Sequence, residues 1–549
     1  MKVYEAIGDT LSRLGVDTVF GLLGSGNFDL VHHMAENRGV TFRASRHEAA
    51  SVGMAAGYAL ASGRLGIATV HQGPGVTNTL TALTEAVKSR VPLLLIAADT
   101  ATTALHQNLD IEQDAVVRSV GAAVQRMRGA KTAVEDVTLA VRRAEVERRP
   151  VVISVPIDLQ EQDCEVSEPP VPVGYEISSA RPSQEAVQRI ADLLELAQRP
   201  LIIGGRGAVL ASAGPALKRL GDRVGALFAT SAAAKGLFAG SPFDLGISGG
   251  FASPLAARLI QEADVILSFG ASLNHWMTGH GNLISPEARV VHCDTEASAL
   301  GRIQPVSLGV VGDAAETAEA LLDELVLRGA EMEGFRTESV LRDLQNFRWE
   351  DTFEDESTED TVDPRSVLIE LDRLLPAERT VAVDCGHFMG FPARHLSVPD
   401  PSAFVFAEAF QSVGLGFGTG MGAAVARPER LAVVVIGDGG LLMSLGELDA
   451  AIHLGLPLLV VVINDAAYGA EVHHFRPKGV SLDLARFEGT DFAAVATAMG
   501  ERGLVVRGIS DLSSLEEWLA NPEGLMVVDC KVNPQVEGDY LREAFRAEA

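Results

Sequence analysis

The chain has few of the features that define disulfide-bonded, zinc-finger or membrane proteins. Only 4 of its 549 residues are cysteine, and no two of them form a Cys-x-x-Cys pair. Such scarcity excludes a disulfide framework and a cysteine-rich zinc site, and it is typical of proteins from a reducing cytosol. The longest apolar runs, such as residues 456–463, are too short to span a bilayer. We therefore expect a cytoplasmic protein without a transmembrane segment.

Basic residues are also scarce relative to acidic ones. The sequence has 45 lysines and arginines against 73 aspartates and glutamates, which gives a net charge of −28. A surface this acidic repels nucleic acids and anionic membranes, so we expect neither as a partner. Aromatic residues make up only 5%, whereas hydrophobic residues make up 47% and glycine numbers 54. This composition excludes a disordered chain and favours an α/β protein, in which glycine-rich turns join short apolar strands.

Two segments of unusual composition divide the chain. Residues 164–182 are rich in proline and residues 350–363 are rich in acidic residues, so we expect both to be solvated linkers. They leave three segments that we interpret as domains, at residues 1–165, 183–330 and 363–549. The amino-terminal sequence MKVYEAIGDTL is amphipathic and predicts a first helix rather than a signal peptide.

Short apolar runs alternate with helical patterns in each of the three segments. Because these runs are apolar on both faces, they predict parallel strands covered by helices. The predicted fold class is therefore α/β, with three successive doubly wound parallel-sheet domains. Ligands of such sheets bind at the carboxyl ends of the strands, so the residues that follow each run are the most informative. The clearest predicted strands lie within residues 40–45, 66–73, 92–99, 150–156, 200–205, 263–270, 288–294, 379–386, 431–440, 456–466 and 525–531.

The strongest functional signal is the pair of polar segments Gly437-Asp438-Gly439 and Asn464-Asp465. The 24 residues between them, 440–463, are enough for one helix and one strand, so both segments should reach the same sheet edge. Glycines there let the backbone approach a phosphate, and the next helix offers its amino-terminal N–H groups. Two carboxylates and a backbone carbonyl are hard ligands suited to Mg²⁺. A Gly-Asp-Gly sequence alone can be an ordinary tight turn, but the second acid at this spacing favours the metal site.

This pattern resembles the hallmark of thiamine diphosphate enzymes, and the resemblance to the acetolactate synthase, pyruvate oxidase and benzoylformate decarboxylase group covers the whole chain. It implies a pyrimidine-binding domain, a central Rossmann-like domain and a diphosphate-binding domain, in that order. It also implies thiamine diphosphate and Mg²⁺ as cofactors, with Asp438, Asp465 and the carbonyl of Ala467 as metal ligands. Relatives carry asparagine where this chain has Asp465, which keeps an oxygen ligand and adds a negative charge. The further cofactor contacts that the resemblance implies are Gly437, Gly439, Gly440, His387, Asn464 and Tyr468.

Two other segments resemble parts of the same family that handle the cofactor's reactive end. Residues 46–50, RHEAA, resemble the segment whose glutamate hydrogen-bonds the pyrimidine ring, which makes Glu48 a predicted catalytic and cofactor-binding residue. A carboxyl group there can relay the proton that activates the cofactor. Residues 414–418, GLGFG, resemble the segment that bends the cofactor, which makes Leu415 the apolar wedge. The ordinary alternatives are a surface glutamate at a helix start and a core leucine.

The residues that should decide the reaction resemble two branches of the family. Residues 73–78, GPGVTN, resemble a loop of acetolactate synthases, whereas His71 and Ser25 resemble residues of benzoylformate decarboxylases. A histidine can relay protons near neutral pH, and a serine can hold a carboxylate. The ordinary alternatives are a buried, hydrogen-bonded histidine and a turn serine.

The predicted function is decarboxylation of a 2-oxo acid followed by carboligation to an aldehyde or ketone acceptor, with Glu48, His71 and Ser25 as catalytic residues. A non-oxidative 2-oxo-acid decarboxylase is the alternative. A non-catalytic cofactor-binding homologue is a third reading, which the joint presence of Glu48, Asp438 and Leu415 disfavours.

Several weaker signals complete the sequence-based picture. The loop His275-to-His280 follows a strand and could place either ring near substrate, while adjacent His473 and His474 cannot both face inward from one helix. Residues 205–207, Gly-Arg-Gly, resemble a dinucleotide loop but lack its third glycine, so the loop is a weak signal. The family that the chain resembles includes FAD-binding members, which makes FAD a possible further cofactor. In relatives two subunits enclose each cofactor, which implies a homodimer or homotetramer in which Glu48 and Asp438 meet across a two-fold interface.

Overall fold

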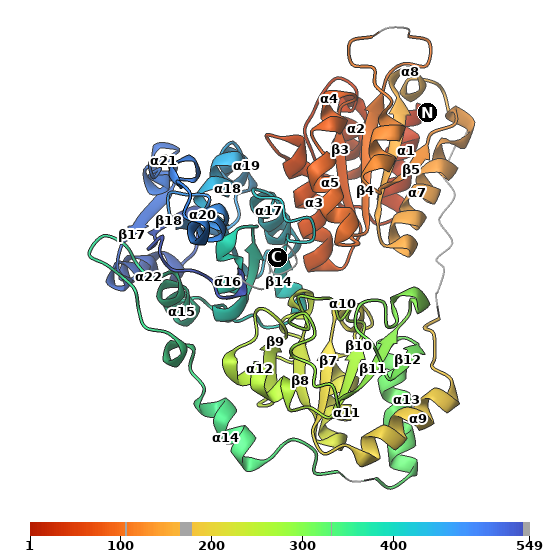
Figure 1. Cartoon of the computed structure of the whole chain (residues 1–549). Coiled ribbons are helices and arrows are strands. Elements are labelled where there is room, and N and C mark those ends of the chain that lie inside the picture. Colours follow the sequence, from red (N-terminus) through yellow and green to blue (C-terminus); the bar gives the residue numbers. More distant parts are fainter. Residues whose placement is uncertain (105–106, 165–177, 331, 542–549) are drawn as a thin grey trace.

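The computed structural model describes residues 1–104, 107–164, 178–330 and 332–541. Within them lie three six-stranded sheets in which every strand pairing between named strands is parallel. Helices pack on each sheet, and the three domains lie around a common centre (Figure 1). The predicted α/β class with three doubly wound parallel sheets is confirmed. The exact domain limits 1–165, 183–330 and 363–549 stay a prediction, and most of the proline-rich linker, residues 165–177, lies outside the described residues.

The first sheet has the strand order β2-β1-β3-β4-β6-β5. The predicted first helix forms because Val3, Ile7 and Leu11 recur at helical spacing and are buried together. The strands are β1 (Thr18–Gly21), β2 (Thr41–Ala44), β3 (Gly66–Val70), β4 (Leu93–Asp99), β5 (Ala123–Arg126) and β6 (Pro150–Pro156). The helices are α1 (Val3–Arg13), α2 (Phe28–Arg38), α3 (Glu48–Ser62), α4 (Pro74–Thr77), α5 (Leu80–Lys88), α6 (Gln113–Ser119), α7 (Ala133–Glu147) and α8 (Ile157–Gln160).

The middle sheet has the order β12-β11-β10-β7-β8-β9, so the chain reverses its direction of winding between β10 and β7. Its strands are β7 (Pro200–Gly204), β8 (Leu227–Thr230), β9 (Asp244–Ile247), β10 (Val265–Phe269), β11 (Arg289–Asp294) and β12 (Leu308–Val311). Its helices are α9 (Gln184–Leu196), α10 (Arg206–Leu210), α11 (Gly214–Val224), α12 (Pro254–Gln261) and α13 (Ala314–Leu327), and α14 (Glu338–Asn346) follows in the connection to the third sheet.

The third sheet has the order β14-β13-β15-β16-β18-β17. The four strands β13, β15, β16 and β18 are almost wholly buried, as continuous apolar runs require. The strands are β13 (Arg379–Val383), β14 (Phe404–Phe406), β15 (Leu431–Gly437), β16 (Leu458–Asn464), β17 (Arg502–Val506) and β18 (Leu525–Lys531). The helices are α15 (Pro364–Leu374), α16 (Gly390–His395), α17 (Gly416–Ala426), α18 (Asp438–Met443), α19 (Glu447–Leu454), α20 (Gly469–Phe475), α21 (Phe492–Ala498) and α22 (Ser513–Leu519).

All eleven strands predicted from apolar runs form. The strands that the sequence did not reveal, among those described, are β1, β5, β8, β9, β12, β14 and β17. Five of these seven are edge strands of their sheets. An edge strand pairs on one side only, so a short and partly polar sequence is enough to form it. The acidic linker is exposed over most of its length, as predicted. Its last two residues, Val362 and Asp363, are fully buried, and Asp363 caps the start of α15.

Helices α3 and α17 join the first and third domains through very close packing. Gly57 in α3 leaves no room for a side chain, because a Cβ there would lie 1.9 Å from the carbonyl oxygen of Thr419. Gly422 in α17 is equally constrained by the carbonyl oxygen of Met54, also at 1.9 Å. One hydrophobic core therefore runs through both domains, from Phe20 in β1 to Val434 in β15.

No helix of the described residues is both long enough and apolar enough to cross a membrane.

Candidate active site

The two predicted metal-binding aspartates lie at the carboxyl edge of the third sheet. Strands β15 and β16 pair in parallel with Gly437 opposite Ile463, so Asp438 and Asp465 follow neighbouring strand ends. Asp438 is 3% exposed and Asp465 is 9% exposed. The sheet thus brings together two carboxylates that are 27 positions apart in the numbering, as their spacing predicted.

Each of these carboxylates has one oxygen bound to the backbone and one oxygen without a protein partner. Oδ1 of Asp438 accepts from the N–H of Gly439 at 2.8 Å, and Oδ1 of Asp465 accepts from the N–H of Ala467 at 3.2 Å. Across the residues that the structure describes, neither Oδ2 has a hydrogen-bond partner, although both are buried. A buried, unpartnered carboxylate oxygen is costly unless a cation occupies the space beside it.

The electrostatics of the pair point the same way. Burial raises the pKa of Asp438 to about 6. Burial, followed by the charge of Asp438, raises the pKa of Asp465 to about 8. Two buried carboxylates resist being ionised together, and a divalent cation beside them would offset their repulsion. The residues present therefore fit Mg²⁺. The described chain offers no group of three or more histidine, cysteine, aspartate or glutamate side chains for a metal, so main-chain and diphosphate oxygens would complete this set.

The loop after β16 has an unusual backbone conformation at Ala466. Ala466 adopts a φ of +55°, a left-handed conformation that is uncommon for a residue with a Cβ and is often found at functional sites. Ala467 follows with 6% exposure. Tyr468 lies beside Gly439, where a Cβ would be 3.1 Å from the tyrosine ring. Because position 439 is glycine, no side chain fills the space between the backbone there and the Tyr468 ring.

His387 and His473 form a neutral histidine pair next to the metal site. Nδ1 of His387 lies 3.7 Å from Oδ2 of Asp465, and the His387 and His473 rings are 5.0 Å apart. Burial lowers the pKa of His387 to about 3, so its imidazole is neutral and can donate one N–H. His473 is 5% exposed while His474 is partly exposed, which confirms that only one of the adjacent histidines faces inward.

Asp384 positions the predicted wedge, and the sequence analysis did not identify it. Its carboxylate accepts from the N–H of Gly414 at 2.9 Å and from the N–H of Gly416 at 2.8 Å. These two bonds fix the backbone on both sides of Leu415, which is 9% exposed at the start of α17. Burial raises the pKa of Asp384 to about 6. The available signal was an acidic residue directly after the buried strand β13, as at Asp438 after β15.

Asn464 has a structural role in the folded chain. Its side-chain N–H groups donate to Oδ1 of Asp529 at 2.8 Å and to the carbonyl of Thr490 at 3.0 Å. These bonds tie the end of β16 to β18 and to the segment before α21. Its predicted contact with the cofactor stays a prediction, as do those of Gly437, Gly440 and Tyr468.

The predicted catalytic residues gather at the carboxyl edge of the first sheet. Glu48 begins α3, and its Oε2 accepts from Nδ2 of Asn78 at 2.9 Å. Nδ1 of His71 accepts from the N–H of Gly26 at 3.1 Å, which places the exposed Ser25 beside the His71 ring. Burial lowers the pKa of His71, while the charge of Glu48 acts in the opposite direction. The fold therefore brings the glutamate of RHEAA, the histidine and the GPGVTN asparagine together.

Gln113 holds the GPGVTN loop in place. Its Oε1 accepts from the N–H of Gly73 at 2.7 Å, and its Nε2 donates to the carbonyl of Ala98 at 3.0 Å. Gly73 adopts a φ of +61° and packs against the carbonyl of Leu109, so it cannot be replaced without strain. The loop conformation is thus set both by the buried amide of Gln113 and by the glycine at position 73.

The first-domain and third-domain halves of the site adjoin in one chain. A Cβ on Gly418 would lie 3.2 Å from Cα of Ala50, so the start of α3, with Glu48, lies beside the start of α17, which follows Leu415. The N–H of Arg46 also donates to Oε1 of Glu447 at 3.0 Å, at the start of α19. The meeting of Glu48 and Asp438 across a two-fold interface stays a prediction.

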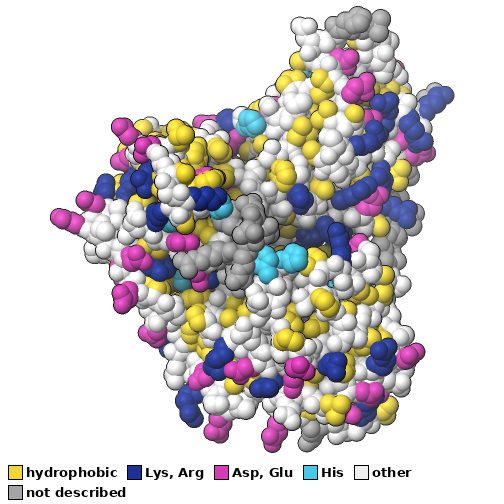
Figure 2. Space-filling view, in the orientation of Figure 1, with side chains coloured by type: hydrophobic (Ala, Val, Ile, Leu, Met, Phe, Trp, Pro, Cys, Tyr) yellow, Lys and Arg dark blue, Asp and Glu magenta, His cyan; other side chains and the backbone are white. Residues whose placement is uncertain are grey.

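The middle domain carries the weaker candidates. Gly205 and Gly207 of the Gly-Arg-Gly loop pack against the backbone of Gly270. A Cβ on Gly205 would lie 2.3 Å from the carbonyl oxygen of Gly270, and a Cβ on Gly207 would lie 2.6 Å from its Cα. Arg206 lies where the first and middle domains meet, near Arg90 and Arg148 of the first domain. Figure 2 shows basic side chains between these two domains. Burial, followed by the charges of Arg90 and Arg148, lowers the pKa of Arg206 to about 10.

The two loop histidines of the middle domain stack on each other. The rings of His275 and His280 are 5.6 Å apart, and His280 adopts a φ of +54°. Their contact with substrate and the presence of FAD stay predictions.

Comparison with known protein families gives three matches in chain order. Residues 1–117 match the N-terminal TPP binding domain of thiamine pyrophosphate enzymes, residues 187–321 match the central domain, and residues 384–530 match the C-terminal TPP binding domain. The first matched range contains Glu48, and the third contains Asp438 and Asp465.

Proteins similar to this chain include sulfoacetaldehyde acetyltransferases and acetolactate synthase subunits. A sulfoacetaldehyde acetyltransferase of Castellaniella defragrans is 28% identical over 544 residues, covering 93% of this chain and 89% of that protein. An acetolactate synthase large subunit of Haemophilus influenzae is 25% identical, covering 98% of this chain and 97% of that protein. A second acetolactate synthase large subunit, of Parasynechococcus marenigrum, is 29% identical over 84% of this chain and 75% of that protein.

Proposed function

This chain belongs to the thiamine diphosphate enzymes, and from that premise we propose that it is a Mg²⁺-dependent enzyme that decarboxylates a 2-oxo acid and transfers the remaining acyl unit to a carbonyl acceptor. The observation that carries this proposal is the pair of buried aspartates with unpartnered oxygens at positions 438 and 465. A homologue that had lost the cofactor would gain stability by replacing such a pair with apolar residues.

Each residue has a distinct task in this proposal. Thiamine diphosphate, when bound, supplies the electron sink that makes loss of CO₂ from a 2-oxo acid feasible. Asp438, Asp465 and the carbonyl of Ala467 hold Mg²⁺, and neutral His387 beside them can donate to a diphosphate oxygen. Glu48 holds and returns a proton at the pyrimidine ring, in a position fixed by Asn78. Leu415 forms an apolar support whose backbone is fixed by Asp384.

Transfer to a second carbonyl compound is favoured over simple decarboxylation by the GPGVTN loop and by the relatives. Those relatives are an acetyltransferase and two acetolactate synthases by name. The chain's identity to them of 25 to 29% supports the reaction class more than any particular donor or acceptor.

Simple decarboxylation is the second candidate because of the arrangement around His71. Its Nδ1 accepts from the N–H of Gly26, so the neutral ring carries its proton on Nε2. A proton donor there, beside Ser25, is what release of an aldehyde requires.

A substrate panel tests the proposal directly. The purified full chain with Mg²⁺ and thiamine diphosphate is incubated with 2-oxo acids, alone and with aldehyde or ketone acceptors, while CO₂ and products are followed by mass spectrometry. We expect CO₂ release together with a carbon–carbon coupled product when an acceptor is present. Aldehyde as the sole product with every acceptor would establish the second candidate, and no CO₂ from any 2-oxo acid would refute both.

A further inference from the structure

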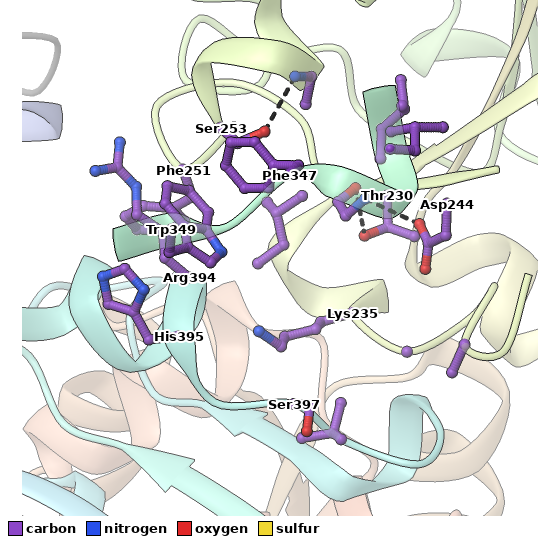
Figure 3. A pocket seen from close by; sticks show the side chains of 18 of the residues that line it. Thr230, Lys235, Asp244, Phe251, Ser253, Phe347, Trp349, Arg394, His395 and Ser397 are labelled. Atoms are coloured by element: carbon purple, nitrogen blue, oxygen red, sulfur yellow. Dashed lines mark hydrogen bonds between the residues drawn. The ribbon is translucent and has the colours of Figure 1, made fainter. Parts of the chain in front are cut away.

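A cavity of about 660 Å³ lies between the middle domain, the third domain and the segment that connects them. It is lined by residues of the β8–β9 region, by Phe347 and Trp349 of the connection, and by residues 395–398 at the end of α16 and just after it (Figure 3). Those last residues lead into β14, at the amino edge of the third sheet. The cavity is therefore separate from the candidate active site, which lies at the carboxyl edge.

Lys235 brings a positive charge into this cavity. Its Nζ donates to the carbonyl of Ala393 and lies 5.4 Å from the centre of the Phe404 ring. Among the described residues no carboxylate forms an ion pair with it. Lys235 keeps accessible surface, as a cavity-lining residue does, yet the surrounding protein lowers its pKa to about 8. It is still largely protonated at pH 7 and lacks a counter-charge in direct contact.

His395 lines the same cavity and carries a buried ring nitrogen without a partner. It is 7% exposed, and within the described chain its Nδ1 has no hydrogen-bond partner. Its ring packs edge-on against Trp349 at 5.0 Å. Burial lowers the pKa of His395 to about 3, so the ring is neutral and can donate an N–H without adding charge.

Arg394 and Asp372 also line the cavity, and both already have partners of opposite charge. Arg394 donates to Oδ1 of Asp539 at 2.5 Å and to the carbonyl of Gly250 at 2.8 Å. Asp372 pairs with Arg379, which does not line the cavity. These two cavity residues therefore neither need a ligand nor repel one strongly.

Asp244 is the remaining acid, and it lies away from the Lys235 ammonium. Its Oδ1 accepts from the N–H of Gly246 at 2.9 Å, and burial raises its pKa. Figure 3 shows the Lys235 nitrogen pointing toward the side where His395 lies, with Asp244 on the opposite side. The end of the cavity between Lys235 and His395 is thus suited to one negative charge.

The remaining walls are largely apolar and aromatic, with Phe251, Phe347 and Trp349 close to the polar end in Figure 3. A cavity of this size with a few convergent polar groups is typical of a small-molecule site. We propose that this cavity binds a small organic carboxylate with an apolar or aromatic body, whose carboxylate accepts from Lys235 and His395. Such a ligand would supply the counter-charge that Lys235 lacks and would fill the apolar remainder.

Binding there would add a further contact between three parts of the chain, beside the core that Phe251 already shares with the third domain. Because the ligand binds the folded arrangement alone, it should raise the melting temperature, and the increase should grow with the logarithm of its concentration once that exceeds Kd. The proposal does not depend on the reaction that the enzyme catalyses, since the cavity and the candidate active site share no lining residue.

Benzoate and benzamide are a matched pair of probes, equal in shape but differing in charge. We expect isothermal titration of the full chain to show benzoate binding at least tenfold more tightly than benzamide. Lys235→Met keeps the length of the side chain and removes the charge, and it should weaken benzoate at least tenfold while leaving benzamide unchanged. Lys131→Met removes the same charge from the first domain and should bind both probes like the wild type.

A second variant keeps the test decisive if Lys235→Met unfolds by circular dichroism. Asp244→Asn retains the acceptor for Gly246 and removes the acid opposite Lys235, so benzoate should bind it more tightly than the wild type. Equal affinity for benzoate and benzamide, or benzoate binding that neither variant changes, would overturn the proposal.

Discussion

Single residues at the candidate site differ in how strongly their surroundings constrain their charge. Asp438 and Asp465 are buried together with an unpartnered oxygen each, whereas Glu48 remains partly accessible and bound to Asn78. A bound cation would therefore stabilise the first pair, while the accessible carboxyl group of Glu48 could take part in proton transfer. Predictions at this scale separate the two roles.

Glu48→Gln tests proton transfer. The amide keeps the side-chain shape and can still meet Asn78, but it has no ionisable proton. We expect thiamine diphosphate to bind while exchange of its C2 proton and turnover fall by about 10²–10⁴, the usual scale of general acid–base catalysis. Deuterium exchange followed by NMR checks this, with Glu36→Gln on the exposed face of α2 as the control. Exchange at the wild-type rate would assign activation to another group.

His71→Ala tests which product the site releases. If His71 supplies the proton that frees an aldehyde, its loss should lower aldehyde formation more than CO₂ release, and coupling to an added acceptor should survive or increase. If His71 only orients substrate, both products should fall together. Product ratios by mass spectrometry distinguish these cases, and a variant with unchanged ratio and unchanged turnover would remove His71 from the site.

Metal binding should depend on pH through Asp465. Its pKa of about 8 means that below this pH the carboxyl carries a proton that Mg²⁺ must displace. We expect the apparent Mg²⁺ affinity to rise by up to about tenfold per pH unit from pH 6 to 8, and then to level off. Asp465→Asn has no proton to lose and should bind Mg²⁺ with a shallower pH dependence.

Calorimetric Mg²⁺ titration of both proteins with saturating thiamine diphosphate measures this difference, because the comparison cancels the proton equilibria of the diphosphate itself. Parallel pH profiles for the two proteins would show that Asp465 is not a ligand.

Among the elements, the crossing of α3 and α17 determines how the two halves of the site are held together. Glycines on both helices allow their backbones to touch, and the same helices begin at Glu48 and directly after Leu415. The crossing therefore sets how the first and third domains of one chain are placed relative to each other.

Gly57→Ala should disrupt this crossing. The added Cβ would lie 1.9 Å from the carbonyl oxygen of Thr419, a backbone atom that cannot move independently. We expect the free energy of unfolding to fall by about 1–3 kcal/mol, the usual cost of overpacking, with a lower melting temperature. Gly53→Ala in the same helix is the control, because its Cβ would have its nearest neighbour at 3.4 Å. Equal melting temperatures for the two variants would contradict the close contact.

At the level of the whole molecule, apolar side chains remain exposed around both halves of the site. Leu442 is 40% exposed and Met443 is 64% exposed, directly after Asp438. Leu23 is 43% exposed and Phe28 is 51% exposed, beside the loop that holds Ser25. Exposed apolar residues grouped near a site are typical of surfaces that another chain covers.

We accordingly expect a homodimer or a larger homo-oligomer in solution. Light scattering should give at least twice the chain mass of 58.0 kDa at concentrations where the enzyme is active. Met443→Glu places a charge on the exposed patch and should shift the protein toward monomer with a parallel loss of activity. A monomeric wild type with full activity would refute this expectation.

The sequence by itself determined the fold class and the positions of the two acidic centres. Buried parallel strands need continuous apolar runs, and the residues after those runs reach the ligand-binding edge wherever the strand lies in the sheet. Asp438 and Asp465 could therefore be identified from their places after apolar runs and from their spacing, whereas Glu48 was identified by the resemblance of residues 46–50 to a family segment. The missed strands are mostly edge strands, whose short sequences carry a weaker pattern than the central ones.

Only the tertiary structure decided which residues support those centres and what else the molecule can bind. Asp384 matters because it meets Gly414 and Gly416, and Gly57 matters because it meets Thr419. The cavity exists because Lys235 and His395, from different domains, face one space. Such relations depend on contacts between residues that are far apart in the chain, and local sequence patterns do not encode those contacts.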